Sequence, residues 1–392
     1  MEKIKITGYG AISCAGLNAE DSIRNLLDPG YECGPFQPSA AIGTSLPVPV
    51  FEIPDMPETE PGRRSHYLAE QAVAEAIERA GLTRQQLESE PVGVIFGTTI
   101  AGQLNDLPLY AAIRAGEEAS LEGLQRYMAA SPAEWIQQKF GLTGPQITLS
   151  NACASGSDIL GVAELWIRTG MCRRVIAVGA DGMNRVPIAG FYSLGVASLK
   201  ACMPFDRDRS GLNLGEGAGA VILESDSAAT ARNAKASFAF TAYGNACDAY
   251  HITRPHPEGK GLRTAIEDAL ARAGLTPDDI SFINAHGTST PANDFCEGNL
   301  FPRIFGENVK YLSTKGWTGH TLGAAGVLEC VFTLLMMEQE RIPASRGFRN
   351  TDPEIPIPPV SCETALKDVR YALSTSLAFG GSNAAVILER LS

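Results

Sequence analysis

Two segments of the chain, Ser155 to Thr169 and Ala324 to Met337, combine helical periodicity with apolar residues on almost every side. A helix on a protein surface keeps one polar face, so a helix that is apolar all round is expected to lie between other layers. The sequence therefore predicts a fold of more than three layers, with these two helices inside it.

Short apolar runs rich in β-branched residues recur along the chain and predict buried strands. Amphipathic segments lie between them, notably Ser65 to Ala80 and Gly261 to Ala273. Strands that alternate with helices are typical of an α/β architecture. The runs begin at Ile4, Val92, Ile147, Val175, Ala218, Ile280, Tyr371 and Ala384.

A faint internal repeat suggests that this architecture is duplicated. The run at Val92 resembles the run at Ile280, and the segment at Leu149 resembles that at Leu373. Two glycine-rich strand ends can also look alike by chance, so the repeat has two explanations. We interpret it as two halves, residues 1–240 and 241–392, each with one sheet and one buried helix.

Charge, hydropathy and cysteine usage exclude several classes of protein. The 392 residues include 32 basic and 44 acidic ones, a net charge of -12, which argues against a nucleic-acid binder. No run approaches the roughly 18 apolar residues of a membrane span. Nine cysteines, an odd number without a C-x-x-C pair, suggest neither a disulfide framework nor a zinc site. We therefore expect a cytoplasmic protein that does not insert into membranes.

An acidic protein partner would need a local basic patch on so acidic a chain. Basic residues that cluster in the sequence are candidates, although each can equally be an ordinary solvated charge. The candidates for docking such a partner are Arg63, Arg64, Lys200, Arg207 and Arg209.

Cys153 is the candidate nucleophile. It lies in NACASGSDILGVAELW, where a strand-like run ends in small residues and a long helix begins. The N-terminus of a helix favours thiolate over thiol, and small neighbours let a thioester approach. A buried, inert thiol is the usual state of a cysteine, but the other eight lack this strand-turn-helix setting.

Two of the five histidines, His286 and His320, stand in glycine-flanked loops near apolar strands, where α/β folds place functional groups. Ionisable residues lie close to both in sequence and would set which ring nitrogens donate hydrogen bonds, unless they form ordinary surface pairs. These residues are Lys315, Asp294, Glu297 and Glu329.

The stretch LAFGGSN places Phe379 before two glycines. Its backbone N–H, together with that of Cys153, would make an oxyanion hole for a tetrahedral intermediate. A plain turn with a buried phenylalanine would show the same spacing.

Taken together, these motifs resemble the β-ketoacyl-[acyl carrier protein] synthases of the elongating type, within the thiolase-like superfamily. NACASGS is similar to the nucleophile motif of that family, AHGTSTPAND to its first histidine loop, STKGWTGHTLGAAG to its lysine and second histidine loop, and LAFGGSN to its phenylalanine loop. The match spans nearly the whole chain, and the motifs occur in the family's order.

The resemblance implies a duplicated αβαβα fold of five layers, a dimer, and a decarboxylative condensation without metal or redox cofactor. Cys153 would take an acyl group from the phosphopantetheine arm of acyl carrier protein, and His286 and His320 would bind the malonyl thioester oxygen. Lys315 would orient the histidines, while Asp294, Glu297 and Glu329 would support them and Phe379 would hold the oxyanion. The partner subunit would be a second copy or another ketosynthase-like chain.

The chain departs from the family pattern at Met203, where an arginine is usual, at Ser210, where an aspartate is common, and at Leu377, where a phenylalanine is frequent. These departures suggest a polyketide or polyene pathway instead of primary fatty-acid synthesis.

Three related classes are alternatives. A degradative thiolase needs a second cysteine in its C-terminal glycine-rich loop, but that loop reads AFGGSN here and has no cysteine. An initiating synthase has asparagine at the position of His320. A chain-length factor, the non-catalytic partner of some ketosynthases, usually lacks the nucleophile that Cys153 provides. The pair of histidines and the cysteine favour the elongating synthases.

Overall fold

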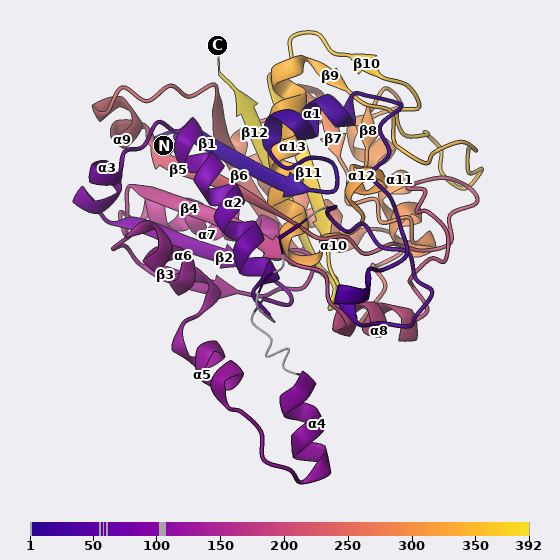
Figure 1. Cartoon of the computed structure of the whole chain (residues 1–392). Coiled ribbons are helices and arrows are strands. Elements are labelled where there is room, and N and C mark those ends of the chain that lie inside the picture. The colour runs from indigo at the N-terminus through magenta and orange to yellow at the C-terminus, as the bar shows by residue number, and fades with distance from the viewer. Residues whose placement is uncertain (1, 55, 58, 60–61, 102–106, 392) are drawn as a thin grey trace.

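The computed structural model describes residues 2–54, 56–57, 59, 62–101 and 107–391. Ten strands form one mixed sheet (Figure 1): β1 (Ile4–Ser13), β2 (Val92–Gly97), β3 (Gln146–Leu149), β4 (Arg174–Asp181), β5 (Gly217–Ser225), β6 (Phe238–Cys247), β7 (Ile280–Asn284), β8 (Tyr311–Leu312), β11 (Tyr371–Leu377) and β12 (Ser382–Arg390). A separate ribbon pairs β9 (Arg341–Ile342) with β10 (Thr364–Ala365).

The helices are α1 (Ala19–Leu26), α2 (Arg64–Arg79), α3 (Arg84–Ser89), α4 (Leu107–Ala115), α5 (Glu122–Ala129), α6 (Pro132–Phe140), α7 (Ser155–Arg168), α8 (Arg185–Ser193), α9 (Asp226–Ala231), α10 (Lys260–Ala273), α11 (Pro291–Phe305), α12 (Lys315–Thr318) and α13 (Ala325–Gln339). Short 3-10 turns are η1 (Ala40–Ile42), η2 (Pro277–Asp279) and η3 (Leu322–Ala324).

The strand order shows the duplication directly. The sheet runs β3-β2-β4-β5-β1-β6-β12-β11-β7-β8. When the sheet strands of each half are numbered in chain order, both halves show the order third, second, fourth, fifth, first from the outer edge of the sheet to its centre. The halves meet where β1 pairs with β6, Ile4 opposite Phe240. We propose that the boundary between the halves falls just before β6, because the boundary expected after residue 240 would cut this strand.

One of the two expected repeats follows this symmetry and the other does not. The runs at Val92 and Ile280 are β2 and β7, the second strand of each half. Leu149 ends β3, a third strand, whereas Leu373 lies in β11, a fourth strand, so pairing those two segments was wrong. The structural counterpart of the Cys153 segment is the segment after β8, because each leads into a central helix. Many strand ends in this chain carry small residues, so two segments that are not structurally equivalent can look alike in sequence.

The helices complete a five-layer αβαβα arrangement. Helices α2 and α6 pack outside the strands of the first half, and α10 and α11 pack outside those of the second. Helices α7 and α13 lie between the two halves of the sheet and contact each other. The thiolase-like fold expected from the sequence is confirmed.

The two central helices differ in how completely they are covered. Every residue of α13 from Ala325 to Met337 is buried, and although the 18-residue segment Leu322–Gln339 is apolar enough for a membrane span, 89% of it is inside the protein. Helix α7 is less enclosed than expected, because Leu165 is 57% exposed. One side of α7 therefore reaches the surface, and α13 is the true core helix.

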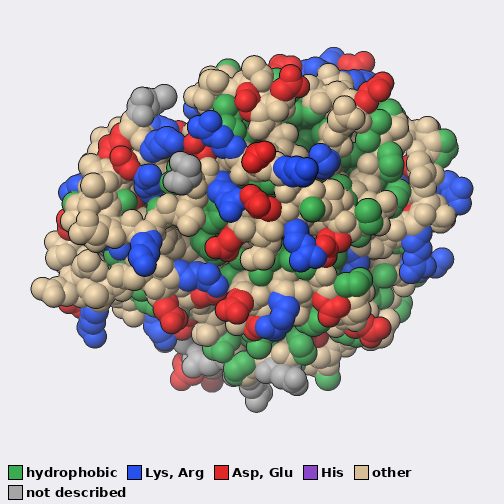
Figure 2. All heavy atoms as spheres, turned by 90° about the horizontal axis from the view of Figure 1, so that it is seen from above, with side chains coloured by type: hydrophobic (Ala, Val, Ile, Leu, Met, Phe, Trp, Pro, Cys, Tyr) green, Lys and Arg blue, Asp and Glu red, His purple; other side chains and the backbone are tan. Residues whose placement is uncertain are grey.

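On the face shown in Figure 2, basic and acidic side chains are interspersed, without one large field of a single sign. Helices α4 and α5 project away from the layered body (Figure 1), and Ile113 and Met128 on them are exposed.

The central helices approach closely only because glycines stand at their contact. A Cβ atom on Gly156 of α7 would lie 2.7 Å from the backbone nitrogen of Val327 and 2.9 Å from that of Gly326, both on α13. Interiors this densely packed do not absorb an added methyl group without displacement.

We predict that Gly156→Ala lowers the free energy of unfolding by about 1–3 kcal/mol, because the new methyl group must push α7 from α13. Urea denaturation followed by circular dichroism measures this. Gly190→Ala on α8 is the matched control, since a Cβ there meets nothing within 4 Å. Equal effects of the two changes would contradict the close contact.

Candidate active site

Cys153 occupies a tight turn between β3 and α7. Ala152 before it has a φ of 45°, in the left-handed region, and the turn is held by the Ser155 hydroxyl, which donates to the Ala152 carbonyl at 2.7 Å. The Asn151 N–H in turn donates to Ser155 Oγ at 2.7 Å. This turn places the thiol just before the N-terminus of α7, as the sequence predicted, and leaves it 4% exposed.

His320 contacts the thiol directly. Its Nε2 lies 3.0 Å from Cys153 Sγ. The segment from Leu212 to Gly215 fixes the histidine backbone, since the His320 N–H donates to the Asn213 carbonyl at 2.8 Å and the Gly215 N–H donates to the His320 carbonyl at 3.0 Å. Within the part of the chain that the structure describes, His320 Nδ1 has no hydrogen-bond partner.

His286 lies in the loop after β7 and faces His320. The two ring centroids are 5.1 Å apart and the rings are nearly perpendicular, at 87°. Lys315 Nζ lies 3.3 Å from His286 Nδ1. A charged lysine can only donate there, so we assign the neutral tautomer that carries its proton on Nε2.

Lys315 is buried between His286 and a carboxylate of α13. It is 1% exposed and forms an ion pair with Glu329. Burial raises the pKa of Glu329 to about 7, and the neighbouring lysine opposes that rise. The ion pair therefore holds Lys315 Nζ beside His286 in a site closed to solvent.

Glu297 and Asp294 on α11 support the loop of His286, and they do so through its backbone. Glu297 accepts hydrogen bonds from the backbone N–H of His286 at 2.9 Å and of Gly287 at 2.7 Å. Asp294 accepts from the N–H of Ser289 at 3.1 Å and of Phe205 at 2.7 Å. Burial raises the pKa of Glu297 to about 7 and of Asp294 to about 6.

Burial dominates the electrostatics of the three reactive side chains. It raises the pKa of Cys153 to about 12, although Lys315 and the backbone N–H groups of Phe379 and Cys153 favour the thiolate. It also lowers the pKa of His286 and of His320 well below the ordinary value, an effect that Lys315 reinforces. Desolvation of Cys153 thus opposes the thiolate that the helix N-terminus was expected to favour, and it is the larger effect on the pKa. Both shifts favour a neutral thiol beside a neutral imidazole over an ion pair.

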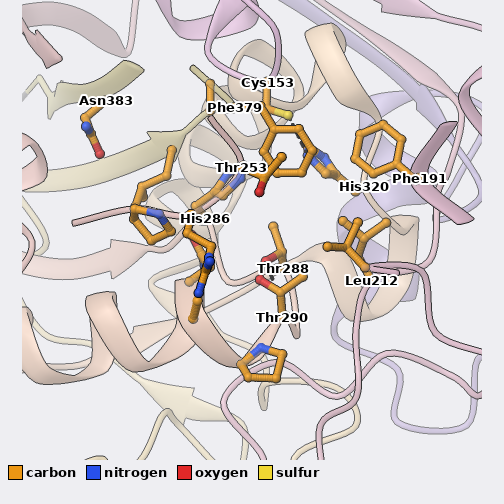
Figure 3. A pocket seen from close by; sticks show the side chains of 18 of the residues that line it. Cys153, Phe191, Leu212, Thr253, His286, Thr288, Thr290, His320, Phe379 and Asn383 are labelled. Atoms are coloured by element: carbon orange, nitrogen blue, oxygen red, sulfur yellow. Dashed lines mark hydrogen bonds between the residues drawn. The ribbon is translucent and has the colours of Figure 1, made fainter. Parts of the chain in front are cut away.

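A cavity of about 220 Å³ opens onto these groups. Figure 3 shows Cys153, His286 and His320 directed into it from different elements, with Phe379 and Phe191 beside them. The Phe379 ring stacks on Phe191 of α8, with centroids 5.4 Å apart. Leu377, one of the departures noted above, also lines the cavity.

Sequence reasoning missed two residues of this region. Phe191 lies on an exposed helix without a motif. Asp181 ends β4 and is 1% exposed, and its carboxylate accepts hydrogen bonds from the N–H of Gly323 at 2.7 Å and of Ile100 at 3.0 Å. The acidic residue that ends the apolar run VIAVGAD was the available signal.

The basic residues proposed for partner docking differ in their surroundings. Arg64 bonds to the buried Glu216 at 2.5 Å, and Arg209, 5% exposed, pairs with Asp352. The guanidinium groups of Arg64 and Arg209 are already paired with these two carboxylates, so they do not fit a docking role. Arg63 lies over the Trp135 ring at 4.3 Å, while Lys200 and Arg207 are exposed. Arg63, Lys200 and Arg207 therefore remain the candidates for docking an acidic partner.

Comparison with known proteins places the chain in one family. The model described as "Beta-ketoacyl synthase, N-terminal domain" matches residues 50–229, and "Beta-ketoacyl synthase, C-terminal domain" matches residues 238–349. The chain is 32% identical to "3-oxoacyl-[acyl-carrier-protein] synthase 2" of Synechocystis sp., over 99% of this chain and 98% of that protein.

Two solved structures are similar over their whole length. "The ishigamide ketosynthase/chain length factor" has a TM-score of 0.87 at 31% identity, with 100% of both chains covered. A chain of a type II polyketide synthase "acyl-carrier protein in complex with its ketosynthase bound to the hexaketide" has a TM-score of 0.88 at 25% identity, again with 100% of both covered.

The raised pKa of Cys153 predicts the pH dependence of its alkylation. Only the thiolate reacts, and below a pKa of about 12 its fraction grows about tenfold per pH unit. We expect the rate of iodoacetamide labelling at Cys153, measured by peptide mass spectrometry, to rise throughout pH 7 to 10. A free cysteine peptide should approach its plateau within that range, because its pKa is about 8.5.

Cys153→Ser identifies the labelled peptide in this experiment. A rate that is already constant below pH 8 would mean that Cys153 and His320 form an ion pair at rest, and it would contradict the neutral pair.

Proposed function

Since the chain belongs to the β-ketoacyl synthase family, we propose that it catalyses the decarboxylative condensation of an acyl group with a malonyl thioester, as a β-ketoacyl-[acyl carrier protein] synthase. The observation that carries this proposal is the contact of Cys153 Sγ with His320 Nε2, at 3.0 Å, beside His286 in one cavity. The residue roles below are part of the proposal.

In the first step Cys153 takes the acyl group from a phosphopantetheine thioester. His320 accepts the thiol proton as the sulfur attacks, because the thiol alone is too weak an acid to ionise. The N–H groups of Cys153 and Phe379 stabilise the tetrahedral oxyanion. The arm then leaves as a thiol and takes the proton from His320, so the histidine is neutral again.

In the second step a malonyl thioester binds and loses CO2. The electron pair of the broken carbon–carbon bond is delocalised onto the thioester oxygen, which gives an enolate. His286 Nε2–H and His320 stabilise this enolate by hydrogen bonds. The enolate carbon attacks the acyl carbonyl, and Cys153 leaves as a thiolate and takes up one proton from solvent, which balances the step. Lys315 holds the His286 tautomer that donates.

His320 must accept a proton in one step and donate a hydrogen bond in the next. Its Nδ1 has no partner within the described ranges, so no neighbour fixes either tautomer. The proposal thus assigns a fixed donor role to His286 and a variable role to His320. The groups it uses are all side chains and backbone N–H groups, and it requires no metal or redox cofactor.

The partners we propose are acyl carrier protein and a second ketosynthase-like subunit, either a copy of this chain or a related one. The edge strand β3 exposes Ile147, and Leu165 of α7 and Met128 of α5 are also exposed. An edge strand has unpaired backbone N–H and C=O groups and can pair with a strand of another chain. The similar structures include a carrier complex and a ketosynthase/chain length factor.

The alternative is a non-catalytic chain-length-factor subunit with the same fold. Cys153, His286, His320 and Lys315 meet in one buried cluster, as a catalytic subunit requires. The relatives are named 3-oxoacyl-[acyl-carrier-protein] synthase 2, and we propose that this protein is soluble and cytoplasmic and acts in fatty-acid, polyketide or polyene synthesis.

We predict that a panel of acyl carrier thioesters labels Cys153 covalently and that Cys153→Ala takes no label and forms no product. His286→Ala should still take label but lose about 10²–10³-fold in malonyl-carrier decarboxylation, because it removes an enolate donor. Intact-protein mass spectrometry and CO2 release measure the two steps. A wild-type protein that takes no acyl group would identify the chain-length-factor alternative.

A second prediction concerns carrier docking. Lys200→Glu with Arg207→Glu should raise KM for carrier-bound acyl groups by about tenfold, since local attraction to an acidic carrier is lost. Acylation from small thioesters should not change. Arg84→Glu is the control, because that side chain is 87% exposed and lies elsewhere on the surface. An unchanged KM would show that the carrier docks at another face.

A further inference from the structure

One positively charged side chain at the cavity has no part in the chemistry above. Arg254 is the only lysine or arginine among the described residues that line the cavity. It is exposed and makes no ion pair within the described part of the chain. Its hydrogen bond joins Nη2 to His251 Nε2 at 3.4 Å. On a chain of net charge -12, a guanidinium that no carboxylate neutralises is free to bind an external anion.

Burial along the cavity shows where Arg254 stands relative to the reacting groups. Cys153, His286 and His320 are at most 4% exposed and form the closed end. Arg254 is exposed and forms part of the open end. Whatever anion it binds is therefore the part of a substrate that stays near solvent while the thioester reaches Cys153.

The loop that carries Arg254 is joined to the turn of Phe379. The Gly380 N–H donates to the Ile252 carbonyl at 2.8 Å, and the Asp248 N–H donates to the Gly381 carbonyl at 2.7 Å. The Asp248 carboxylate closes the loop by accepting from the His256 N–H at 2.9 Å. Arg254 is thus presented from a loop held at two points to the turn that faces the nucleophile.

We propose that Arg254 binds the phosphate of the phosphopantetheine arm while its thioester lies at Cys153; this rests on the proposed function. An arm that bears an uncharged acyl group has its permanent negative charge on the phosphate alone, at the end remote from the thioester. A guanidinium matches phosphate oxygens with paired N–H donors. The malonyl carboxylate is excluded as the intended anion, since it lies next to the thioester and must reach the closed end.

The proposal is tested by removing the phosphate from the substrate as well as the arginine from the protein. Hexanoyl-phosphopantetheine and hexanoyl-pantetheine differ only in the phosphate. Acylation of Cys153 by each is followed by mass spectrometry for wild type, Arg254→Gln and Arg254→Lys, with Arg84→Gln as the control for loss of an exposed arginine.

We expect Arg254→Gln to lower kcat/KM about three- to tenfold for the phosphorylated substrate, mainly through KM, and to leave the unphosphorylated substrate unchanged. Arg254→Lys should recover part of the loss, and salt should reduce the advantage of the phosphorylated substrate in wild type only. Equal losses on both substrates, or none, would overturn the assignment.

Two further outcomes separate this proposal from its neighbours. The same variants are also assayed with malonyl thioesters that carry or lack the phosphate. A loss of activity in Arg254→Gln that is confined to these malonyl thioesters would assign Arg254 to the malonyl carboxylate and overturn the phosphate assignment. If neither hexanoyl substrate labels wild-type Cys153, while Arg254→Gln behaves like wild type, both the phosphate site and the proposed acyltransferase activity fail. Labelling of wild type by both substrates keeps the proposed function whatever Arg254 does.

Discussion

The distance between the nucleophile and His320 is set by how closely the N-terminal ends of α7 and α13 approach. Gly156 and Gly326 face each other there, and a Cβ on either would collide with the backbone of the opposite helix. Cys153 lies just before one helix and His320 a few residues before the other, so this contact brings them together. The chemistry depends on two helix ends that touch without side chains between them.

The same burial that builds the site decides its protonation. Desolvation penalises every charge, so it raises the pKa of a thiol and lowers the pKa of an imidazole, and both shifts disfavour the ion pair. The charge that remains is that of Lys315, which Glu329 neutralises. The shifts favour catalysis that starts from a neutral thiol and a neutral imidazole, and the donors aimed at developing negative charge have their largest effect in a space without water.

The sequence predicted the nucleophile, both histidines and the two central helices because each carries a local signal: a small-residue turn, a glycine-flanked loop, or apolar residues on every side. It did not predict β6, whose alanines, glycine and asparagine dilute the strand pattern in FAFTAYGNAC. It also did not show that Arg64 and Arg209 are held by Glu216 and Asp352, which are far away in sequence. Pairings between distant residues, and the balance between burial and a helix N-terminus, exist only after the chain has folded.

Duplication explains why the site draws on both halves. The loop after β2 and the loop after β7 occupy equivalent places, and each is held by a buried carboxylate that accepts backbone N–H groups, Asp181 for the first and Glu297 for the second. The segments after β3 and β8 are equivalent as well, and they supply Cys153 and His320. Two copies of one loop-and-helix frame thus face each other across the central layer. Because the two halves share a backbone arrangement but differ in their side chains, the first half provides the nucleophile and the second provides the side chains that accept protons and stabilise negative charge.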